Sequence, residues 1–278
     1  MTSAPDADHY GVVGHPIAHS WSPFIHGMFA KATAQNLVYR MFDIRPDDFR
    51  REVLRMFAGG FRGLNVTVPH KQAAAELVNE LTARAARAQA VNTIAFFDDR
   101  TLLGDNTDGA GLTSDLELNL KLELSAKRLL ILGAGGAVRG VLGPLLEREF
   151  GEVWIANRTP AKARALAAEF ADMGTVSACG FADLRGPPFD LVLNATSAGL
   201  QGEMAPLPPG IVGATTVCYD MSYGRGDTPF TRWAKSLHAA QAVKGWGMLV
   251  EQAAESFLLW RGIRPNTRPV LDALAEHF

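Results

Sequence analysis

Hydrophobic and polar residues alternate over residues 64–68 of the segment 63–71, which reads Gly-Leu-Asn-Val-Thr-Val-Pro-His-Lys. The apolar residues fall on one face of a two-residue period and Asn65 and Thr67 on the other, which predicts a β-strand. Pro69 has no amide hydrogen to donate to a sheet, so the strand should end there and a helix should begin at Lys71. These polar side chains are expected at the carboxyl end of a strand, where open α/β sheets bind ligands. An alternative is an edge strand whose polar face meets water.

The same patterning predicts further strands and helices along the chain. Strands are expected over residues 10–14, 37–42, 90–97, 101–104, 129–132, 152–156, 190–193 and 215–219. Helices are expected over residues 23–29, 46–59, 71–78, 82–88, 111–120, 137–150, 228–238 and 245–260. The strands at 90–97 and 101–104, with a turn at 98–100 between them, indicate a hairpin.

Composition narrows the class of protein. The chain has 278 residues, of which 47% are hydrophobic and 20% charged, as in a globular protein of one large or two ordinary domains. The net charge of −2 gives no support for binding nucleic acid or an anionic membrane. Cys179 and Cys218 form neither a disulfide framework nor a metal-binding motif, so small thiols in a reduced compartment are expected.

The chain shows no targeting or membrane segment. Residues 1–9 are polar and do not resemble a signal peptide. No apolar run approaches the roughly 18 residues that a membrane helix needs. We therefore expect a cytoplasmic protein.

Two serines precede a predicted helix. Ser22 followed by Pro23 fits a helix N-cap with proline at the first helical position. Capping alone accounts for Ser22, whereas Ser20 lies two residues earlier and is not explained in this way. Two hydroxyls beside a helix N-terminus are suited to hold a carboxylate.

The predicted hairpin leads into residues 105–109, which read Asp-Asn-Thr-Asp-Gly. Asp108 could simply cap the helix that follows, a common role of aspartate. Gln252, one turn inside the helix predicted at 245–260, could likewise be a solvated polar residue.

A glycine-rich turn lies between a strand and a helix. It consists of Gly133, Ala134, Gly135, Gly136 and Ala137, and it follows the apolar strand 129–132. This context is that of a dinucleotide-binding fingerprint, although the third glycine of the consensus would fall at Val138.

The next strand indicates which dinucleotide binds. It ends in Asn157, Arg158 and Thr159, with Lys162 close behind and no acidic residue nearby. NAD sites place an acid there for the ribose 2′-hydroxyl, whereas a guanidinium suits a 2′-phosphate. The sequence therefore predicts NADP. The strands at 190–193 and 215–219 also end in small or polar residues, at the same sheet edge.

Nine short motifs follow one another in a fixed order and spacing. They are 14–22 (GHPIAHSWS), 65–71 (NVTVPHK), 90–94 (AVNTI), 106–109 (NTDG), 133–137 (GAGGA), 157–159 (NRT), 194–200 (NATSAGL), 220–223 (DMSY) and 247–252 (GMLVEQ). In this order the chain resembles the shikimate dehydrogenase family over nearly its whole length.

The resemblance implies an NADP-dependent, reversible reduction of 3-dehydroshikimate to shikimate, a step of the chorismate and aromatic amino-acid pathway. It implies an α/β fold with two open-sheet domains. A discontinuous substrate-binding domain would comprise residues 1–106 and 241–278, and an inserted Rossmann-type NADP-binding domain residues 107–240. It also implies a monomer or homodimer, with neither a metal nor a nucleic acid as partner.

The family's functional residues can be matched one by one. Lys71 and Asp108 correspond to the catalytic pair and would also contact substrate. Ser20, Ser22 and Tyr223 would hold the substrate carboxylate region, and Asn65, Thr67, Asn92 and Gln252 the ring hydroxyls. The cofactor would be held by Gly133, Ala134, Gly135, Gly136, Ala137, Asn157, Arg158, Thr159, Lys162, Thr196, Met221 and Gly245, with Met221 and Gly245 bordering the nicotinamide.

The chemistry of the two matched residues agrees with this assignment. Hydride transfer to a ketone builds charge on oxygen, so an acid must deliver a proton there. A lysine polarises such an oxygen well, and an adjacent aspartate favours its charged form and orients it. We expect Lys71 to be the proton donor and Asp108 its partner, although which of the two moves the proton is left open.

Three positions depart from the family pattern: His15, Gln89 and Lys244 stand where Asn, Gly and Asp are frequent. One alternative is a quinate/shikimate dehydrogenase with relaxed cofactor or substrate choice, against which Arg158 argues. Another is a non-catalytic, NADP-binding redox-sensing regulator. That alternative explains the glycine turn but not Lys71, Asp108 and Gln252 together.

Overall fold

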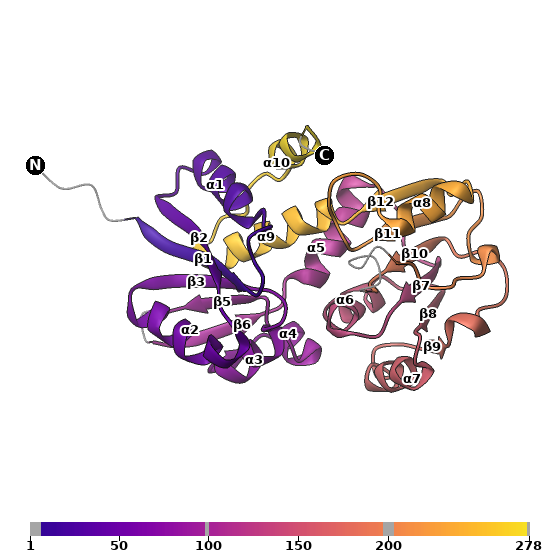
Figure 1. The fold of residues 1–278 in the computed structure, drawn as a ribbon, viewed down its shortest axis with the longest axis horizontal. Coiled ribbons are helices and arrows are strands. Elements are labelled where there is room, and N and C mark those ends of the chain that lie inside the picture. The colour runs from indigo at the N-terminus through magenta and orange to yellow at the C-terminus, as the bar shows by residue number, and fades with distance from the viewer. Residues whose placement is uncertain (1–6, 98–99, 197–202, 277–278) are drawn as a thin grey trace, which may run out of the picture. The chain divides into compact units, whose positions relative to one another are not determined.

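The computed structural model describes residues 7–97, 100–196 and 203–276. The chain divides into two compact units, each an open sheet packed against helices (Figure 1). Unit 1 comprises Met1–Gly111 and Val250–Ala273, and unit 2 comprises Leu112–Leu249 and Leu274–Phe278. The α/β class with two open sheets, expected from the resemblance, is confirmed.

Unit 1 holds a mixed six-stranded sheet in the order β2-β1-β3-β5-β6-β4. Its strands are β1 (Asp8–Gly14), β2 (Leu37–Asp43), β3 (Phe61–Val66), β4 (Glu80–Leu81), β5 (Thr93–Phe96) and β6 (Leu102–Asp105). Its helices within residues 1–111 are α1 (Ser22–Ala32), α2 (Phe49–Ala58), α3 (Lys71–Leu77) and α4 (Ala83–Ala88). The antiparallel pairing of β5 with β6 confirms the predicted hairpin, although residues 98–99 of its turn lie outside the described part of the chain.

The strand predicted before Pro69 lies inside the sheet. β3 pairs with β1 on one side and β5 on the other, so the alternative of a water-facing edge strand is wrong. The strand ends at Val66, two residues earlier than predicted, because residues 67–70 form a turn closed by the His70 amide donating to the Thr67 carbonyl. Val68 is therefore 69% exposed instead of continuing the apolar face.

Unit 2 holds a fully parallel sheet in the order β12-β11-β10-β7-β8-β9. The strands are β7 (Arg128–Leu132), β8 (Glu152–Ala156), β9 (Val176–Cys179), β10 (Leu191–Asn194), β11 (Val217–Asp220) and β12 (Gln241–Lys244). The helices between them are α6 (Gly136–Leu146), α7 (Pro160–Glu169) and α8 (Pro229–Ser236). This is the doubly wound Rossmann order, in which the chain reverses direction across the sheet between β7 and β10.

Both faces of the unit 2 sheet are buried. Leu129 and Ile131 of β7 pack into one apolar cluster, and Leu130 and Leu132 into a second cluster on the opposite face. Alternate residues of a strand point to opposite faces, so a strand covered on both sides reads as a continuous apolar run. That accounts for the Leu-Leu-Ile-Leu sequence before the glycine turn.

Two helices cross from one unit to the other. The boundaries fall within α5 (Asp108–Ser114) and α9 (Trp246–Arg261). A π-helical turn over Asp115–Asn119 follows α5, and α10 (Arg268–Ala275) follows α9. The domain limits of 106/107 and 240/241 stay a prediction.

Several elements differ from the sequence-based expectations. β4, β9 and β12 were not predicted, the strand expected at 90–97 spans only Thr93–Phe96, and the helix expected at 137–150 ends at Leu146. The missed strands are only two to four residues long, too short for a periodic pattern to stand out. Among the described residues, no helix combines the length and apolar character needed to cross a membrane.

Candidate active site

Lys71 and Asp108 meet within unit 1, as the resemblance implies. Lys71 is the first residue of α3 and Asp108 the first of α5. Lys71 Nζ donates to Asp108 Oδ2 at 2.5 Å, and the two side chains are 25% and 10% exposed. A charge-assisted hydrogen bond of this kind holds an ammonium group in place while one side of it stays open to a ligand.

Asn92 orients the Asp108 carboxylate. Its Nδ2 donates to Asp108 Oδ1 at 2.8 Å and to Thr107 Oγ1 at 2.9 Å, and its Oδ1 accepts from the Thr107 amide at 2.9 Å. The two carboxylate oxygens of Asp108 thus have different partners, Asn92 for Oδ1 and Lys71 for Oδ2. Asp108 is more than a helix cap, since its oxygens bond side chains from two other segments.

Gln252 joins the same group from α9. Its Oε1 accepts from Asn92 Nδ2 at 3.3 Å and from Thr107 Oγ1 at 3.4 Å. The alternative of a solvated polar position is therefore wrong. Gly111 permits this approach, because a Cβ there would lie 2.6 Å from the Gln252 amide nitrogen.

Asn65 is buried in a layer of hydroxyl groups. Its Nδ2 donates to Ser256 Oγ at 2.9 Å and to Thr93 Oγ1 at 3.1 Å, and its Oδ1 accepts from the Tyr39 hydroxyl at 2.7 Å. Thr93 Oγ1 donates onward to Asn92 Oδ1 at 2.9 Å. A continuous hydrogen-bonded chain therefore joins Asn65 to the residues around Asp108.

Sequence reasoning missed four members of this network: Tyr39, Thr93, Thr107 and Ser256. Thr93 and Thr107 lie inside two of the nine motifs, directly beside Asn92 and Asp108, so their position was a signal. Ser256 follows Gln252 by four residues and thus shares its helix face. Tyr39 had no such signal.

The two serines before α1 contact each other. The N-cap of this helix is Trp21, so the expectation that Ser22 caps it is wrong, and Ser22 is instead its first residue. Ser20 Oγ accepts from the Ser22 amide at 3.3 Å and donates to Ser22 Oγ at 3.2 Å. Ser22 is 7% exposed and Ser20 is half-buried. Thr67 lies in the turn after β3, where its amide donates to the carbonyl of Val13 at 2.9 Å.

In unit 2, the glycine-rich turn connects β7 to α6. Gly133 has a φ of 110°, a conformation that glycine adopts readily, and the Ala195 carbonyl oxygen lies 3.1 Å from where its Cβ would be. Gly135 and Gly136 are exposed, with open space where side chains would stand, so a phosphate can approach the helix N-terminus. Val138, in place of the consensus glycine, is fully buried in the core.

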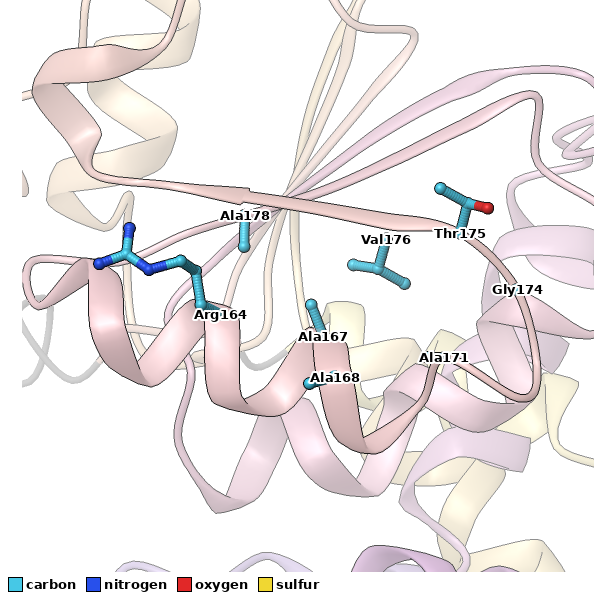
Figure 2. A pocket seen from close by; sticks show the side chains of 8 residues that line it. All are labelled: Arg164, Ala167, Ala168, Ala171, Gly174, Thr175, Val176 and Ala178. Carbon is cyan, nitrogen blue, oxygen red and sulfur yellow. The ribbon is translucent and has the colours of Figure 1, made fainter.

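The segment after β8 carries exposed cations. Arg158, Thr159 and Lys162 are all exposed, and Asn157 Nδ2 donates to the Thr159 carbonyl at 3.0 Å, which closes the turn before α7. Farther along α7, Arg164 lines a separate hollow of about 410 Å³ against β9 (Figure 2). That hollow is backed mainly by alanine side chains and offers no catalytic group.

Asp220 organises the carboxyl ends of β10 and β11. Its Oδ1 accepts from Asn194 Nδ2 at 3.1 Å and from the Ser222 amide at 3.0 Å, and its Oδ2 accepts from Thr228 Oγ1 at 2.6 Å. Burial raises the pKa of Asp220, and these donors act in the opposite direction. Asn194 Oδ1 in turn accepts from Thr196 Oγ1 at 2.8 Å. The last four residues of the motif at 194–200 lie outside the described part of the chain.

Met221 and Gly245 lie side by side in unit 2. The Met221 carbonyl oxygen is 2.6 Å from where a Gly245 Cβ would stand, so a larger residue would not fit. The Tyr223 ring centroid lies 4.8 Å from that of Trp246. Tyr223 thus belongs to unit 2, whereas Ser20 and Ser22 belong to unit 1.

The structure shows the local setting of two residues that depart from the family pattern, Lys244 and Gln89. Lys244 Nζ donates to the carbonyls of Gly224 and Gly226 at 3.0 and 2.9 Å, so it ties down the loop that follows Tyr223. Gln89 has a φ of 50°, which explains why glycine is frequent at that position. Among the described residues, no three His, Cys, Asp or Glu side chains group as a metal site would require.

Comparison with known proteins places the chain in a family. Residues 12–94 match the shikimate dehydrogenase substrate-binding domain, residues 116–201 the shikimate/quinate 5-dehydrogenase model, and residues 245–275 the shikimate 5′-dehydrogenase C-terminal domain. The shikimate dehydrogenase (NADP(+)) of Aeromonas salmonicida is 54% identical, over 97% of this chain and 98% of that protein. The protein of the same name from Methylococcus capsulatus is 52% identical, over 96% of each chain.

A solved structure agrees with these relatives. Shikimate 5-dehydrogenase from Thermus thermophilus, in complex with NADP(H) and shikimate, is 33% identical with a TM-score of 0.85. The match covers 98% of this chain and 100% of that one. The chain therefore belongs to the shikimate dehydrogenase family.

Proposed function

We infer that the chain catalyses the NADP-dependent, reversible reduction of 3-dehydroshikimate to shikimate, within the biosynthesis of chorismate and the aromatic amino acids. The single observation that carries this from the structure is the Lys71–Asp108 pair, at 2.5 Å, surrounded by Asn92 and Gln252. Full-length relatives more than half identical to the chain carry the name of this activity. Neither alternative, a relaxed quinate dehydrogenase nor a redox-sensing regulator, is favoured.

The roles of the individual residues form part of the proposal. Lys71 donates a proton from Nζ to the carbonyl oxygen as that oxygen becomes a hydroxyl, and it accepts the proton in the reverse direction. Asp108 holds Nζ in place through its hydrogen bond, and Asn92 prevents the carboxylate from rotating by bonding its other oxygen. Preorganised donors of this kind stabilise developing charge without having to reorganise during the reaction.

Substrate binding is proposed for the remaining polar residues. Ser20 and Ser22, with Tyr223, hold the carboxylate region of the ring. Asn65, Thr67, Asn92 and Gln252 recognise the ring hydroxyls. The buried bonds of Asn65 and Asn92 to neighbouring side chains support this role, because they fix each amide in one orientation.

NADP is the cofactor, and NADPH when bound supplies the hydride. We propose that the turn Gly133–Ala137 binds the pyrophosphate and that Arg158, with Asn157, Thr159 and Lys162, binds the 2′-phosphate. The open backbone of the turn and the exposed cations after β8 support this assignment. Thr196, Met221 and Gly245 also contact the cofactor, and Met221 and Gly245 border the nicotinamide.

We also propose that the protein acts in the cytoplasm as a monomer or homodimer. Cys179 and Cys218 are both free thiols, as in proteins of a reduced compartment.

The direct test is to add 3-dehydroshikimate to the purified protein with NADPH and to follow the loss of NADPH absorbance. Rapid, saturable oxidation that yields shikimate is expected, with far slower oxidation when NADH replaces NADPH. Dehydroquinate in place of 3-dehydroshikimate is the control for substrate choice. A protein that binds NADPH but oxidises it with neither substrate would refute the proposed activity and favour the regulator.

A further inference from the structure

Asp105 is a buried carboxylate three residues before Asp108, at the end of β6. Its side chain is 3% exposed. The Arg84 guanidinium donates to both carboxylate oxygens, from Nε to Oδ1 at 2.7 Å and from Nη2 to Oδ2 at 2.5 Å. Thr82 Oγ1 and the Asn106 amide also donate to Oδ1, at 2.6 and 2.8 Å. Four hydrogen bonds therefore hold a carboxylate to which the proposed function assigns no role.

A short relay connects Asp105 to the catalytic carboxylate. The Asn106 amide is held by Asp105 Oδ1, and the Asn106 side chain donates to the Ala90 carbonyl at 3.0 Å. Asn106 Oδ1 then accepts from the Asp108 amide at 3.2 Å. The backbone position of Asp108 thus depends, through Asn106, on how Asp105 is held.

The Arg84 guanidinium also faces α9. Its Nη1 lies 3.8 Å from Glu255 Oε2, and Arg264 bridges Glu255 and Glu251 with two contacts of 3.0 Å. Glu251 and Glu255 flank Gln252 on this helix. One chain of alternating charges therefore joins the segment that carries Asp108 to the helix that carries Gln252.

A solvent-exposed ion pair contributes little to the stability of a protein. In the Arg84–Asp105 pair, however, the carboxylate is buried. Desolvation would raise the pKa of the Asp105 carboxyl, yet hydrogen bonding and charge from Arg84 lower it overall. A planar, two-pronged guanidinium fixes a carboxylate in orientation as well as in position, which a lysine does not.

We propose that Arg84 is a positioning residue of the reaction: it locks Asp105 and thereby sets Asp108 against Lys71. The inference rests on the proposed function, because it assigns Arg84 a role through the proposed catalytic carboxylate. Arg84 itself need not touch the substrate or the cofactor.

The first test is Arg84→Met, which removes the charge and keeps the aliphatic stem. Small displacements of a catalytic group can cost up to ~100-fold in rate, so we expect kcat to fall about 10- to 100-fold. The KM values for 3-dehydroshikimate and NADPH should change much less. Arg84→Lys keeps the charge without the fork and should fall between the parent and Arg84→Met.

Arg148→Met is the matched control. Arg148 also makes a two-pronged contact, with Glu117 at 3.1 and 3.5 Å, and is 29% exposed against 33% for Arg84. It lies in unit 2, and its side-chain partners among the described residues are Glu117, Glu147 and the Pro144 carbonyl, none of which belongs to the proposed site. Its kcat should remain that of the parent even if its melting temperature falls.

The decisive test repeats both Arg84 substitutions in an Asp108→Asn background. If Arg84 acts through Asp108, neither substitution should lower kcat much further there, because residues that act as a unit lose activity non-additively. If the losses of kcat from the Arg84 and Asp108 substitutions multiply in the double variant, or if Arg84→Met keeps the kcat of the parent, the inference is wrong. Should Arg84→Met not fold, the same cycle with Arg84→Lys decides. If the parent protein itself does not reduce 3-dehydroshikimate, the proposed function is wrong as well. If the parent is active and Arg84→Met has the same kcat, only this inference is wrong.

Discussion

The proposed site residues of unit 1 and those of unit 2 differ in how the protein holds them. In unit 1, Asn65, Asn92 and Asp108 are buried and belong to one network of side-chain hydrogen bonds. In unit 2, the corresponding residues are a backbone turn and the exposed side chains of Arg158 and Lys162. Side chains that are held in place before the ligand arrives suit catalysis, whereas exposed cations on a surface turn suit the choice between two similar cofactors.

This difference has an energetic consequence. A buried polar group that loses its partner costs about 1–3 kcal/mol, so substitutions in the unit 1 network should affect stability as well as rate. Exposed substitutions usually change stability by about 0.5 kcal/mol or less. Changes after β8 should therefore alter cofactor choice with little effect on the fold.

The largest effect is expected from the catalytic pair. Lys71→Ala should lower kcat by ~10²–10⁴-fold, the usual contribution of a general acid or base. Substrate affinity should change far less, because an interaction made mainly in the transition state affects kcat. Steady-state kinetics with 3-dehydroshikimate and a separate measurement of shikimate binding would distinguish the two quantities.

Asp108→Asn sharpens this prediction, because it keeps the shape of the side chain and removes its charge. It should also lower kcat, and the double variant should be little worse than the more damaged single variant. Strictly multiplicative losses would mean that the two residues act independently. A near-normal kcat in Lys71→Ala would contradict the catalytic role proposed for Lys71.

The next largest effect tests unit 2. Arg158→Asp should move the ratio of kcat/KM values toward NAD by about a hundredfold or more, since a charge-assisted bond worth ~1.5–3 kcal/mol is lost and a repulsion is added. The measurement is kcat/KM for shikimate oxidation with NADP and with NAD. Arg164→Asp is the matched control, because Arg164 lies on α7 but lines the hollow against β9 (Figure 2). Equal shifts in both variants would mean that overall charge, and not a phosphate site, sets the preference.

The smallest effect concerns a buried histidine of unit 1 that packs against the network without hydrogen bonding to it among the described residues. His26 is 1% exposed, lies flat on Tyr39 with ring centroids 4.2 Å apart, and has no hydrogen-bond partner for either ring nitrogen within the described residues. Burial lowers the pKa of His26 from 6.5 to about 3, and the nearby Asn65 side chain only partly offsets this. The imidazole is therefore neutral in the folded protein and serves as an aromatic ring.

A pH-dependent stability follows from that lowered pKa. Between about pH 6.5 and 3 the unfolded chain takes up a proton at His26 that the folded chain does not, so the free energy of unfolding falls as the pH drops. His26→Phe should reduce the loss of stability between pH 7 and pH 5 by about 2 kcal/mol. Urea unfolding at both pH values measures it. His238→Asn is the control, since His238 is exposed and its φ of 58° is acceptable to asparagine. An equal pH dependence in His26→Phe and in the parent would contradict the prediction.

Local patterns in the sequence were enough to predict much of unit 2. The apolar strand, the glycine turn and the cations after β8 lie within about one βαβ unit, so their geometry depends mainly on neighbours in the chain. In unit 1, the motifs identified Lys71 and Asp108, but local reasoning alone could not separate Asp108 or Gln252 from a helix cap or a solvated residue. Ser22 was wrongly expected as a cap because Ser-Pro fits either the N-cap or the first turn.

By itself, the sequence predicted most of the elements, the turn proposed to bind the dinucleotide and the use of NADP, because periodicity, glycine and charge act over a few residues. Only the tertiary structure decided that β3 lies inside the sheet, that the two carboxylate oxygens of Asp108 bond Lys71 and Asn92, and that Arg84 bonds the carboxylate of Asp105. Lys71 and Asp108 are 37 residues apart in the chain, and Asn92 and Gln252 are 160 apart. Contacts over such separations are set by strand order and helix packing, which no local pattern encodes.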